Sequence, residues 1–277
     1  MNRTESSGAP EGLALPVIAD PGVPVSALNE LFGALSAGRT QLKPLDDLPG
    51  SVDATAALEH VLHGLRRYRV GGPPLVFSLR GAPAEALKRL EETVGDGEVF
   101  VTVKGTHTYE IRETNLPGVW RVRGAGGDFL EVADVPSVVR AANELATCRE
   151  LSVGSPPKEA MNVLPVLAEL RHRMQQAPVK GQPNHVVSFT LLPMNEADMR
   201  YLEQQLQHGP VLAESKGYGT CRVELTGHRN IWSVQFFNAA GVLILDTLEV
   251  GDVPVALCAA DEDIEDSAQR LSELLGA

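Results

Sequence analysis

The sequence has few of the residues that mark disulfide scaffolds, metal centres and membrane proteins. Its 277 residues include three cysteines, Cys148, Cys221 and Cys258, which lie far apart and form no Cys-x-x-Cys motif. A disulfide framework and a structural zinc site are therefore both disfavoured. No run of 18 or more apolar residues occurs, which argues against a membrane span. The N-terminus carries charged residues and lacks the apolar core of a signal peptide, so we expect a cytoplasmic protein.

Basic residues are also scarce. There are 24 lysines and arginines against 36 aspartates and glutamates, which gives a formal net charge of -12. Because a protein that binds a phosphate backbone is normally basic, nucleic acid is an unfavourable partner. An acidic surface attracts a basic peptide, or it simply keeps the protein soluble. The hydrophobic content of 43% is typical of a globular chain with a substantial core.

Residues 1–51 are rich in proline, glycine and serine and are predicted to be a leader and linker. A short apolar-periodic patch from Val25 to Leu35 predicts one helix within it. Two interpretations stay open for this segment. It is either a poorly ordered leader or a segment that docks on a partner.

From about residue 52 the chain repeats itself after a shift of 112 residues. Between Leu90 and Arg123, 10 of 34 positions are identical in the two copies without a gap. After a gap of six residues, the motif Glu131-Val-Ala-Asp-Val-Pro136 matches Glu249-Val-Gly-Asp-Val-Pro254. We therefore expect two units, copy one at residues 52–150 and copy two at residues 157–277.

Each copy predicts the same series of elements. An amphipathic helix opens the unit, at about 53–67 and 161–175, and a strand follows at 75–80 and 186–192. A second helix, capped by Asn195 in copy two, leads into a meander of three or four strands and a last helix that starts at Val-Pro. The predicted fold class is α+β, with two tandem pseudo-equivalent units that are each an antiparallel meander covered by helices.

The clearest strand pattern runs from Gly217 to Pro254 in copy two. Alternating apolar residues predict three antiparallel strands, and Asn238-Ala-Ala-Gly241 predicts a hairpin turn with glycine at positive φ. Copy one has Gly124-Ala-Gly-Gly127 in place of this hairpin and lacks six residues. We infer that copy two kept a surface that copy one did not need; drift in an exposed turn is the alternative.

Three stretches of copy two carry a family resemblance. At Gly217-Tyr-Gly-Thr-Cys221, Asn230-Ile-Trp-Ser-Val-Gln-Phe-Phe-Asn238 and Leu243-Ile-Leu-Asp-Thr-Leu-Glu-Val250, the chain resembles the HupH/HyaF/HoxQ hydrogenase expression proteins. The run Ala259-Ala-Asp-Glu-Asp-Ile-Glu-Asp-Ser267 in the following helix is also similar. The resemblance is strongest from about residue 160 to 275.

The resemblance implies a non-catalytic, chaperone-like accessory role in the maturation of an uptake nickel–iron hydrogenase, without a cofactor. Family members are linked to the small, iron–sulfur-carrying subunit, whose precursor bears a twin-arginine export signal. With a thioredoxin-like companion they are thought to hold that precursor before export. The implied partners are therefore the precursor with its signal peptide and, as a further candidate, the companion.

The candidate partner-binding residues are glycine, aromatic, amide and acidic positions of copy two: Gly217, Tyr218, Gly219, Asn230, Trp232, Gln235, Asn238, Asp261, Glu262 and Asp263. Each has a structural alternative. The Gly217–Gly219 stretch is too short for a phosphate loop and favours a tight turn. Trp232 and its equivalent Trp120 favour core packing, and the amides favour turn chemistry. The acidic run suits a helix N-terminus as well as an electrostatic patch.

A metal site is the weaker prediction. His60 and His63 lie one helical turn apart and His172 is the counterpart of His60, but no carboxylate or cysteine completes a set at ligand spacing. Cys221 is expected to pack as a small apolar residue in a strand. Spacing assigns no catalytic set. A binding protein is thus the first hypothesis. An enzyme or metal-delivery factor that acts on the nickel or iron–sulfur centre is the second, and a dimeric scaffold paired through the meander edge is the third.

Overall fold

The structure is a computed structural model of the chain, and it describes residues 54–105, 107–124, 127–145, 147–176, 183–217 and 219–276. The predicted leader, the helix expected between Val25 and Leu35, and Tyr218 lie outside these residues.

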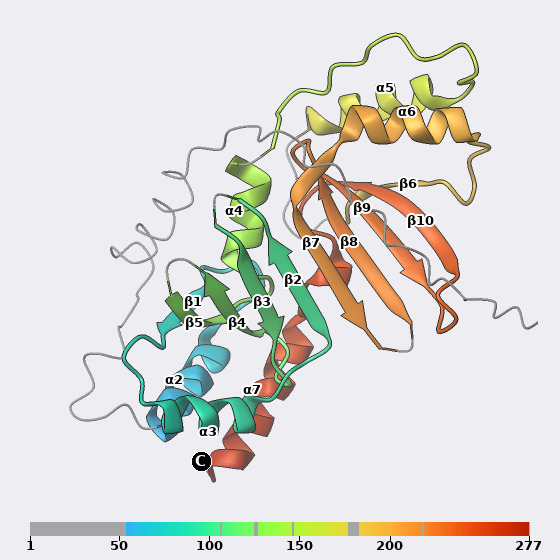
Figure 1. Cartoon of the computed structure of the whole chain (residues 1–277). Coiled ribbons are helices and arrows are strands. Elements are labelled where there is room, and N and C mark those ends of the chain that lie inside the picture. The colour runs from blue at the N-terminus through green and yellow to red at the C-terminus, as the bar shows by residue number, and fades with distance from the viewer. Residues whose placement is uncertain are drawn as a thin grey trace, which may run out of the picture.

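The two copies contain the same elements in the same order (Figure 1). The described part of copy one contains α2 (Ala54–Arg67), β1 (Leu75–Ser78), α3 (Ala84–Val94), β2 (Val99–Val103), β3 (Tyr109–Glu113), β4 (Val119–Gly124), β5 (Gly127–Val132) and α4 (Ser137–Leu145). Copy two contains α5 (Val163–Met174), β6 (His185–Ser188), α6 (Glu196–Leu206), β7 (His208–Lys216), β8 (Thr220–Thr226), β9 (Ile231–Phe237), β10 (Leu243–Val250), the short 3-10 helix η2 (Val255–Leu257) and α7 (Asp261–Leu275). The predicted α+β class and the duplication are confirmed.

Local signals set several element ends as predicted. The Asn195 side chain accepts a hydrogen bond from the Asp198 N–H at 2.9 Å, and the Asp198 carboxylate accepts one from the Asn195 N–H at 3.1 Å, which forms a capping box at the start of α6. Gly241 has φ 74° in the β9–β10 turn, as the hairpin pattern requires.

Two expectations need correction. The last helix of copy two does not start at Val253-Pro254, because η2 and an extended stretch at Cys258 and Ala260 separate that dipeptide from α7. This break carries the chain across to copy one, where the Ala259 N–H donates to the Asp134 carbonyl at 2.8 Å. Copy one also keeps its hairpin, since β4 and β5 pair over their whole lengths; the hairpin is shorter rather than lost.

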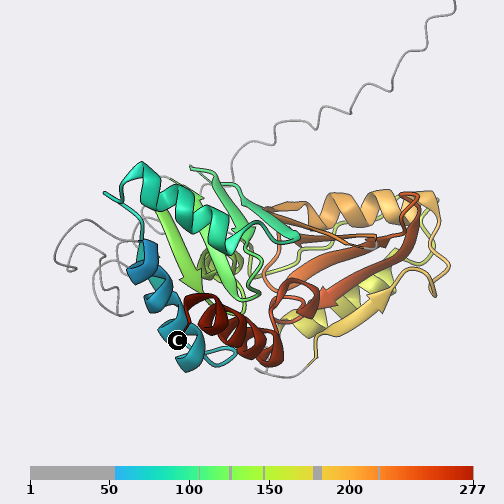
Figure 2. The same ribbon diagram turned by 90° about the horizontal axis from the view of Figure 1, so that it is seen from below.

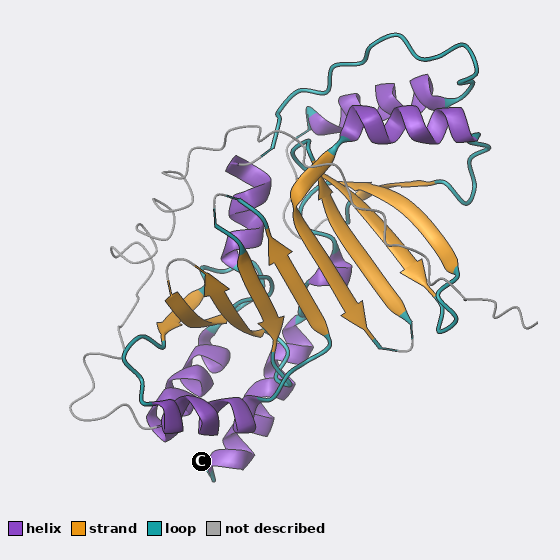
Figure 3. Cartoon of the chain, in the orientation of Figure 1, coloured by secondary structure: helices purple, strands orange, loops and turns teal. Residues whose placement is uncertain are grey.

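The ten strands of the described residues form one antiparallel sheet in the order β1-β5-β4-β3-β2-β7-β8-β9-β10-β6. Figure 3 shows the strands as one layer, with α4 near the middle of the sheet and the other α-helices toward its two ends. The order reads the same from either side once each strand is replaced by its equivalent in the other copy. The two copies therefore share a single sheet that joins at β2 and β7.

The junction has the symmetry of a homodimer interface. Val101 pairs with Ala213, the position 112 residues later, so each residue faces its own counterpart. Val99 pairs with Ser215 and Val103 pairs with Val211, and these two pairs exchange under the same shift. A contact in which residue i meets j and j meets i defines a two-fold axis. The β2–β7 pair therefore lies on a pseudo-two-fold axis.

The last helix of each copy reaches the other copy. Helix α7 lies beside α2 under copy one (Figure 2), where Ile264, Ala268 and Leu271 are buried in the same core cluster as α2 and β5. Helix α4 contacts β7 and packs in a central cluster with copy-two strand residues. The cores of the two copies are consequently shared rather than separate.

Candidate functional site

The candidate residues named from the sequence fall in separate places. Asn230 and Trp232 lie at the junction, the acidic run lies at the start of α7, and a third group lies at the outer end of copy two. That last group contains Gly219, Gln235 and Asn238. Gly217 follows β7 directly and lies beside Glu98 of copy one, on the junction side of copy two.

Asn230 and Trp232 belong to the core, which corrects their assignment as partner contacts. Trp232 is 0% exposed. Asn230 is 8% exposed and adopts φ 61°. The Asn143 amide on α4 donates to Asn230 Oδ1 at 2.8 Å, and the Asn230 N–H donates to Asn143 Oδ1 at 2.8 Å. This pair attaches α4 to the β8–β9 turn, so both predicted residues hold the fold together.

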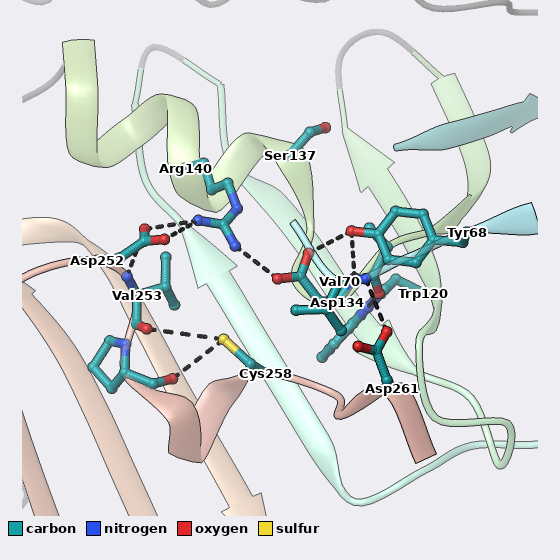
Figure 4. Close-up of polar contacts among 12 residues, drawn as sticks. Tyr68, Val70, Trp120, Asp134, Ser137, Arg140, Asp252, Val253, Cys258 and Asp261 are labelled. Atoms are coloured by element: carbon teal, nitrogen blue, oxygen red, sulfur yellow. Dashed lines mark hydrogen bonds and ion pairs between the residues drawn. The ribbon is translucent and has the colours of Figure 1, made fainter. Parts of the chain in front are cut away.

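The acidic run has a partly structural role. Asp261 Oδ1 accepts a hydrogen bond from the Val70 N–H at 3.0 Å (Figure 4), and Asp263 Oδ2 accepts one from the Ala260 N–H at 3.2 Å. Both carboxylates lie in the first turn of α7, where negative charge is favourable. Glu262 is exposed and forms no hydrogen bond or ion pair with any described residue. The run therefore attaches α7 to copy one and leaves Glu262 at the surface.

A charged network that sequence reasoning missed lies at the junction (Figure 4). Arg140 donates to both carboxylate oxygens of Asp252 at 2.7 Å and to Asp134 at 2.8 Å. Tyr68 donates its hydroxyl to the same buried Asp134 at 2.6 Å. Burial, with Asp134 as its partner, raises the pKa of Tyr68, so the phenol stays a donor. The two aspartates are the repeated Asp of the Glu-Val-x-Asp-Val-Pro motif, a signal that could have found this network.

The thiols of Cys221 and Cys258 are poorly suited to chemistry. Cys258 occupies the position equivalent to Arg140, and its Sγ lies 3.4 Å from the Pro254 carbonyl oxygen. Burial raises the pKa of Cys258 to about 12 and that of Cys221 to about 11. Because the thiolate is the nucleophile and the metal ligand, both thiols are inert at neutral pH.

The histidines do not converge. His60 is on α2 in copy one and bonds to the Ala56 carbonyl, and His172 is on α5 in copy two beside Gln176. Among the described residues, no group of three or more histidine, cysteine, aspartate or glutamate side chains is arranged to hold a metal ion. Histidines that converge on one point would have favoured the metal-delivery hypothesis, and the described part of the chain does not contain such an arrangement.

A cavity of about 360 Å³ lies beside the start of α7 and is lined by Glu98, Glu113, Asp263, Trp120 and Cys258, among others. Burial, followed by the charges of Asp263 and Glu98, raises the pKa of Glu113 to about 7. Three carboxylates and the cationic Arg270 thus line the cavity, and the nearby Cys258 is protonated.

The outer end of copy two presents an unpaired strand edge. Strand β6 pairs with β10 only from Thr247 to Val250. Just beyond this ladder, the Phe189 N–H donates a hydrogen bond to the Asp246 carbonyl at 3.0 Å. On that side of β10, no described strand pairs with Leu243–Leu245. Val242, Leu243, Ile244 and Leu245 are 56%, 43%, 58% and 37% exposed. We call residues 242–245 the open edge.

The predicted residues at this end frame the open edge. Asn238 Oδ1 accepts hydrogen bonds from the N–H groups of Ala240 and Val242 at 2.9 and 3.0 Å, which sets the hairpin turn. Gly219 lies against the same hairpin, since a Cβ there would be 2.3 Å from the Phe237 carbonyl oxygen. Gln235 donates to Asp246 at 3.2 Å. These residues hold the β9–β10 hairpin in position, and they are not themselves part of the open edge.

The fold and its surfaces define a duplicated α+β protein with an exposed strand edge in its second copy. The family model described as the "HupH hydrogenase expression protein, C-terminal conserved region" matches residues 51–149 and 160–277. The chain therefore belongs to the HupH hydrogenase expression protein family.

Similar proteins carry related names. The chain is 42% identical over 244 residues to the hydrogenase expression/formation protein HupQ of Azotobacter chroococcum, covering 85% of this chain and 86% of that protein. It is 30% identical over 239 residues to the hydrogenase-1 operon protein HyaF of Escherichia coli, covering 83% of each. A solved structure of hydrogenase expression protein HupH from Thiobacillus denitrificans gives a TM-score of 0.37 at 21% identity over 42% of this chain and 98% of that one. No helix in the described residues is long and apolar enough to cross a bilayer.

Proposed function

We propose that this chain is a non-catalytic, chaperone-like accessory protein in the maturation of an uptake nickel–iron hydrogenase. It binds the small-subunit precursor in the cytoplasm before twin-arginine export, with a thioredoxin-like protein as a further partner. The observation that carries the proposal is family membership over nearly the whole described chain, since the similar proteins are named as hydrogenase expression or formation proteins.

The chemistry of the described residues supports a binding role. The charged network at the junction is internally paired, because Arg140 forms ion pairs with the buried Asp134 and with Asp252. Two of the thiols are held protonated, as their raised pKa values require. The open edge, in contrast, offers unpaired backbone and apolar side chains, which are the features that a peptide partner uses.

Charge supports a basic partner. The formal net charge of -12 attracts a basic signal peptide over a distance of about 8 Å at physiological salt. Each exposed ion pair contributes about 1 kcal/mol or less, so charge steers the encounter while shape and strand pairing supply specificity.

The test is capture of the small-subunit precursor by the tagged chain, with and without the signal peptide. We expect capture of the full precursor and reduced capture after charge reversal at the exposed Glu262, Glu265 and Asp266. Equal capture without the signal peptide would move the contact to the mature subunit. If neither form is captured, the proposed function is wrong.

A further inference from the structure

The sheet protects its two outer strands in the usual way. Strands β1 and β6 have four residues each, and Pro73 and Pro74 precede β1 directly while Pro183 lies just before β6. Short edges with nearby prolines resist pairing with other chains. The open edge has no such protection, since Val242-Leu-Ile-Leu245 contains neither a proline nor a charge.

A bulge interrupts the ladder at the open edge. Leu243 pairs with Phe237 and Leu245 pairs with Phe236, so the ladder is irregular around Ile244. Such a bulge bends the strand and turns a side chain outward. Phe236 is half-buried against the central core cluster, so the exposed residues are backed by fixed apolar structure. An incoming strand therefore meets exposed apolar side chains along residues 242–245.

Copy one has no equivalent surface. Strand β1 pairs with β5 from Phe129 to Val132, and the Leu79 N–H donates to the Asp128 carbonyl at 2.9 Å. Only Gly127, the first residue of β5, lies beyond this pairing. The extra hairpin length of copy two therefore creates the open edge.

We propose that the open edge binds an extended peptide segment by β-strand addition, in line with β6 and next to Leu243–Leu245. The segment is uncharged and rich in β-branched or apolar residues over about four positions, and basic residues flank it. This inference rests on the proposed function only in that the segment belongs to the hydrogenase precursor.

Charge and continuity favour this occupant over a second copy of the chain. Two copies would each bring a formal charge of -12 and repel one another, whereas basic flanks are attracted. Asp246, at the inner end of the open edge, is half-buried and places a carboxylate there. Strand β6 already adds to the second half of β10, and the peptide would extend the same row of backbone pairing.

The probe is a labelled octapeptide, Lys-Val-Thr-Ile-Thr-Val-Thr-Lys, titrated against the full chain by fluorescence anisotropy. Ile244→Lys should weaken binding at least tenfold. The matched control is Val255→Lys, at a 77% exposed apolar position on η2, which should leave binding unchanged. Circular dichroism and the melting temperature verify that both variants fold.

Backbone pairing has its own signature. Because a strand's N–H groups alternate in direction, N-methylation at every second peptide position should weaken binding at least tenfold, and methylation at the positions between should not. If methylation weakened binding equally at every peptide position, or at none of them, the proposal of strand addition would be wrong. A concentration-dependent dimer that Ile244→Lys abolishes, without peptide binding, would instead assign the edge to a second copy and overturn the proposal.

Failure of this inference differs from failure of the proposed function. Precursor capture that survives Ile244→Lys retains the function and refutes the site. Octapeptide binding that obeys the methylation pattern, without precursor capture, retains the site and refutes the function.

Discussion

Copy one and copy two are built from the same series of elements, yet they use their hairpins differently. In copy one β4 and β5 have six residues each, and β1 covers nearly all of β5. In copy two β9 and β10 have seven and eight residues, and β6 covers only half of β10. A few residues of extra hairpin thus convert a closed edge into an open one while the core is preserved.

The junction shows the same divergence at single positions. Gly118 and Asn230 are equivalent and both have positive φ. Gly118 leaves room for Ile264 of α7, because a Cβ there would lie 2.6 Å from Ile264 Cγ1. Asn230 instead bonds to Asn143 of α4. The pseudo-symmetric sheet therefore carries an asymmetric set of helix contacts, and each copy depends on the other through different chemistry.

Deleting α7 is the largest test of this dependence. A variant that ends at Ala260 should lose the folded core of copy one and keep that of copy two. The loss of Ile264 and Leu271, which are 2% and 0% exposed, removes roughly 3–6 kcal/mol of apolar burial, comparable to the stability of a whole domain. Hydrogen exchange should show α2 and α3 losing protection while α5 and α6 retain it.

Two substitutions on α7 serve as controls. Leu271→Ala should destabilise the protein by roughly 2–5 kcal/mol. Leu274→Ala, at a 64% exposed position on the same helix, should change stability by less than about 0.5 kcal/mol. Undiminished protection of α2 after the deletion would contradict the dependence of copy one on α7.

The equivalent glutamates of the repeated motif provide a test by pH. Glu131 is 2% exposed and accepts a hydrogen bond from the Ser137 N–H at 2.7 Å, and burial raises its pKa from 4.5 to about 7. Its contribution to stability is fully present below pH 4.5, because both states are then protonated. It is lost as the pH rises through 7, since the unfolded chain releases its proton first.

The expected loss from Glu131 is about 3 kcal/mol between pH 4.5 and pH 8. Glu131→Gln should remove this part of the pH dependence of the free energy of unfolding, measured in urea at a series of pH values. Glu249→Gln, at the half-buried equivalent position, should have a smaller effect because solvent reaches that side chain. Identical pH profiles for wild type and Glu131→Gln would contradict the raised pKa.

The two tryptophans give the smallest and cleanest comparison. Trp120 donates its Nε1–H to the Ala133 carbonyl at 2.9 Å, whereas buried Nε1 of Trp232 has no partner among the described residues. Substitution of either tryptophan by phenylalanine removes the same side-chain volume. Trp120→Phe should cost about 1 kcal/mol more than Trp232→Phe in urea unfolding, because it leaves a buried carbonyl unpaired. An equal or reversed order would show that the hydrogen bond contributes nothing.

Periodicity and local caps predicted the order of the elements well, because those signals lie within one segment. Asn195 caps a helix and Gly241 forms a turn, and both roles can be predicted from the neighbouring residues alone. The pairing of β2 with β7 could not be predicted. The alternating pattern of a strand shows which face is buried, but it does not show which strand lies beside it. Val101 meets Ala213 only after both units have formed.

The candidate site was harder to predict because exposure depends on tertiary contacts. Asn230 is polar and lies in a turn, and the burial that removes it from the surface comes from α4. Trp232 follows the core pattern that its equivalent Trp120 also shows. The longer hairpin was visible in the sequence, but the open edge exists only because β6 ends at Ser188.

The packing of α7 against copy one also sets an order of events during synthesis. Helix α7 follows every strand of the sheet along the chain, so on the ribosome copy one is complete in sequence long before its cover exists. At about 5–20 residues per second, the interval between α4 and the end of α7 is on the order of ten seconds. During that interval the unpaired edge of β2 and the uncovered face of α2 are available to other nascent chains. A protein whose own second half completes its first half therefore passes through a period in which it needs protection itself.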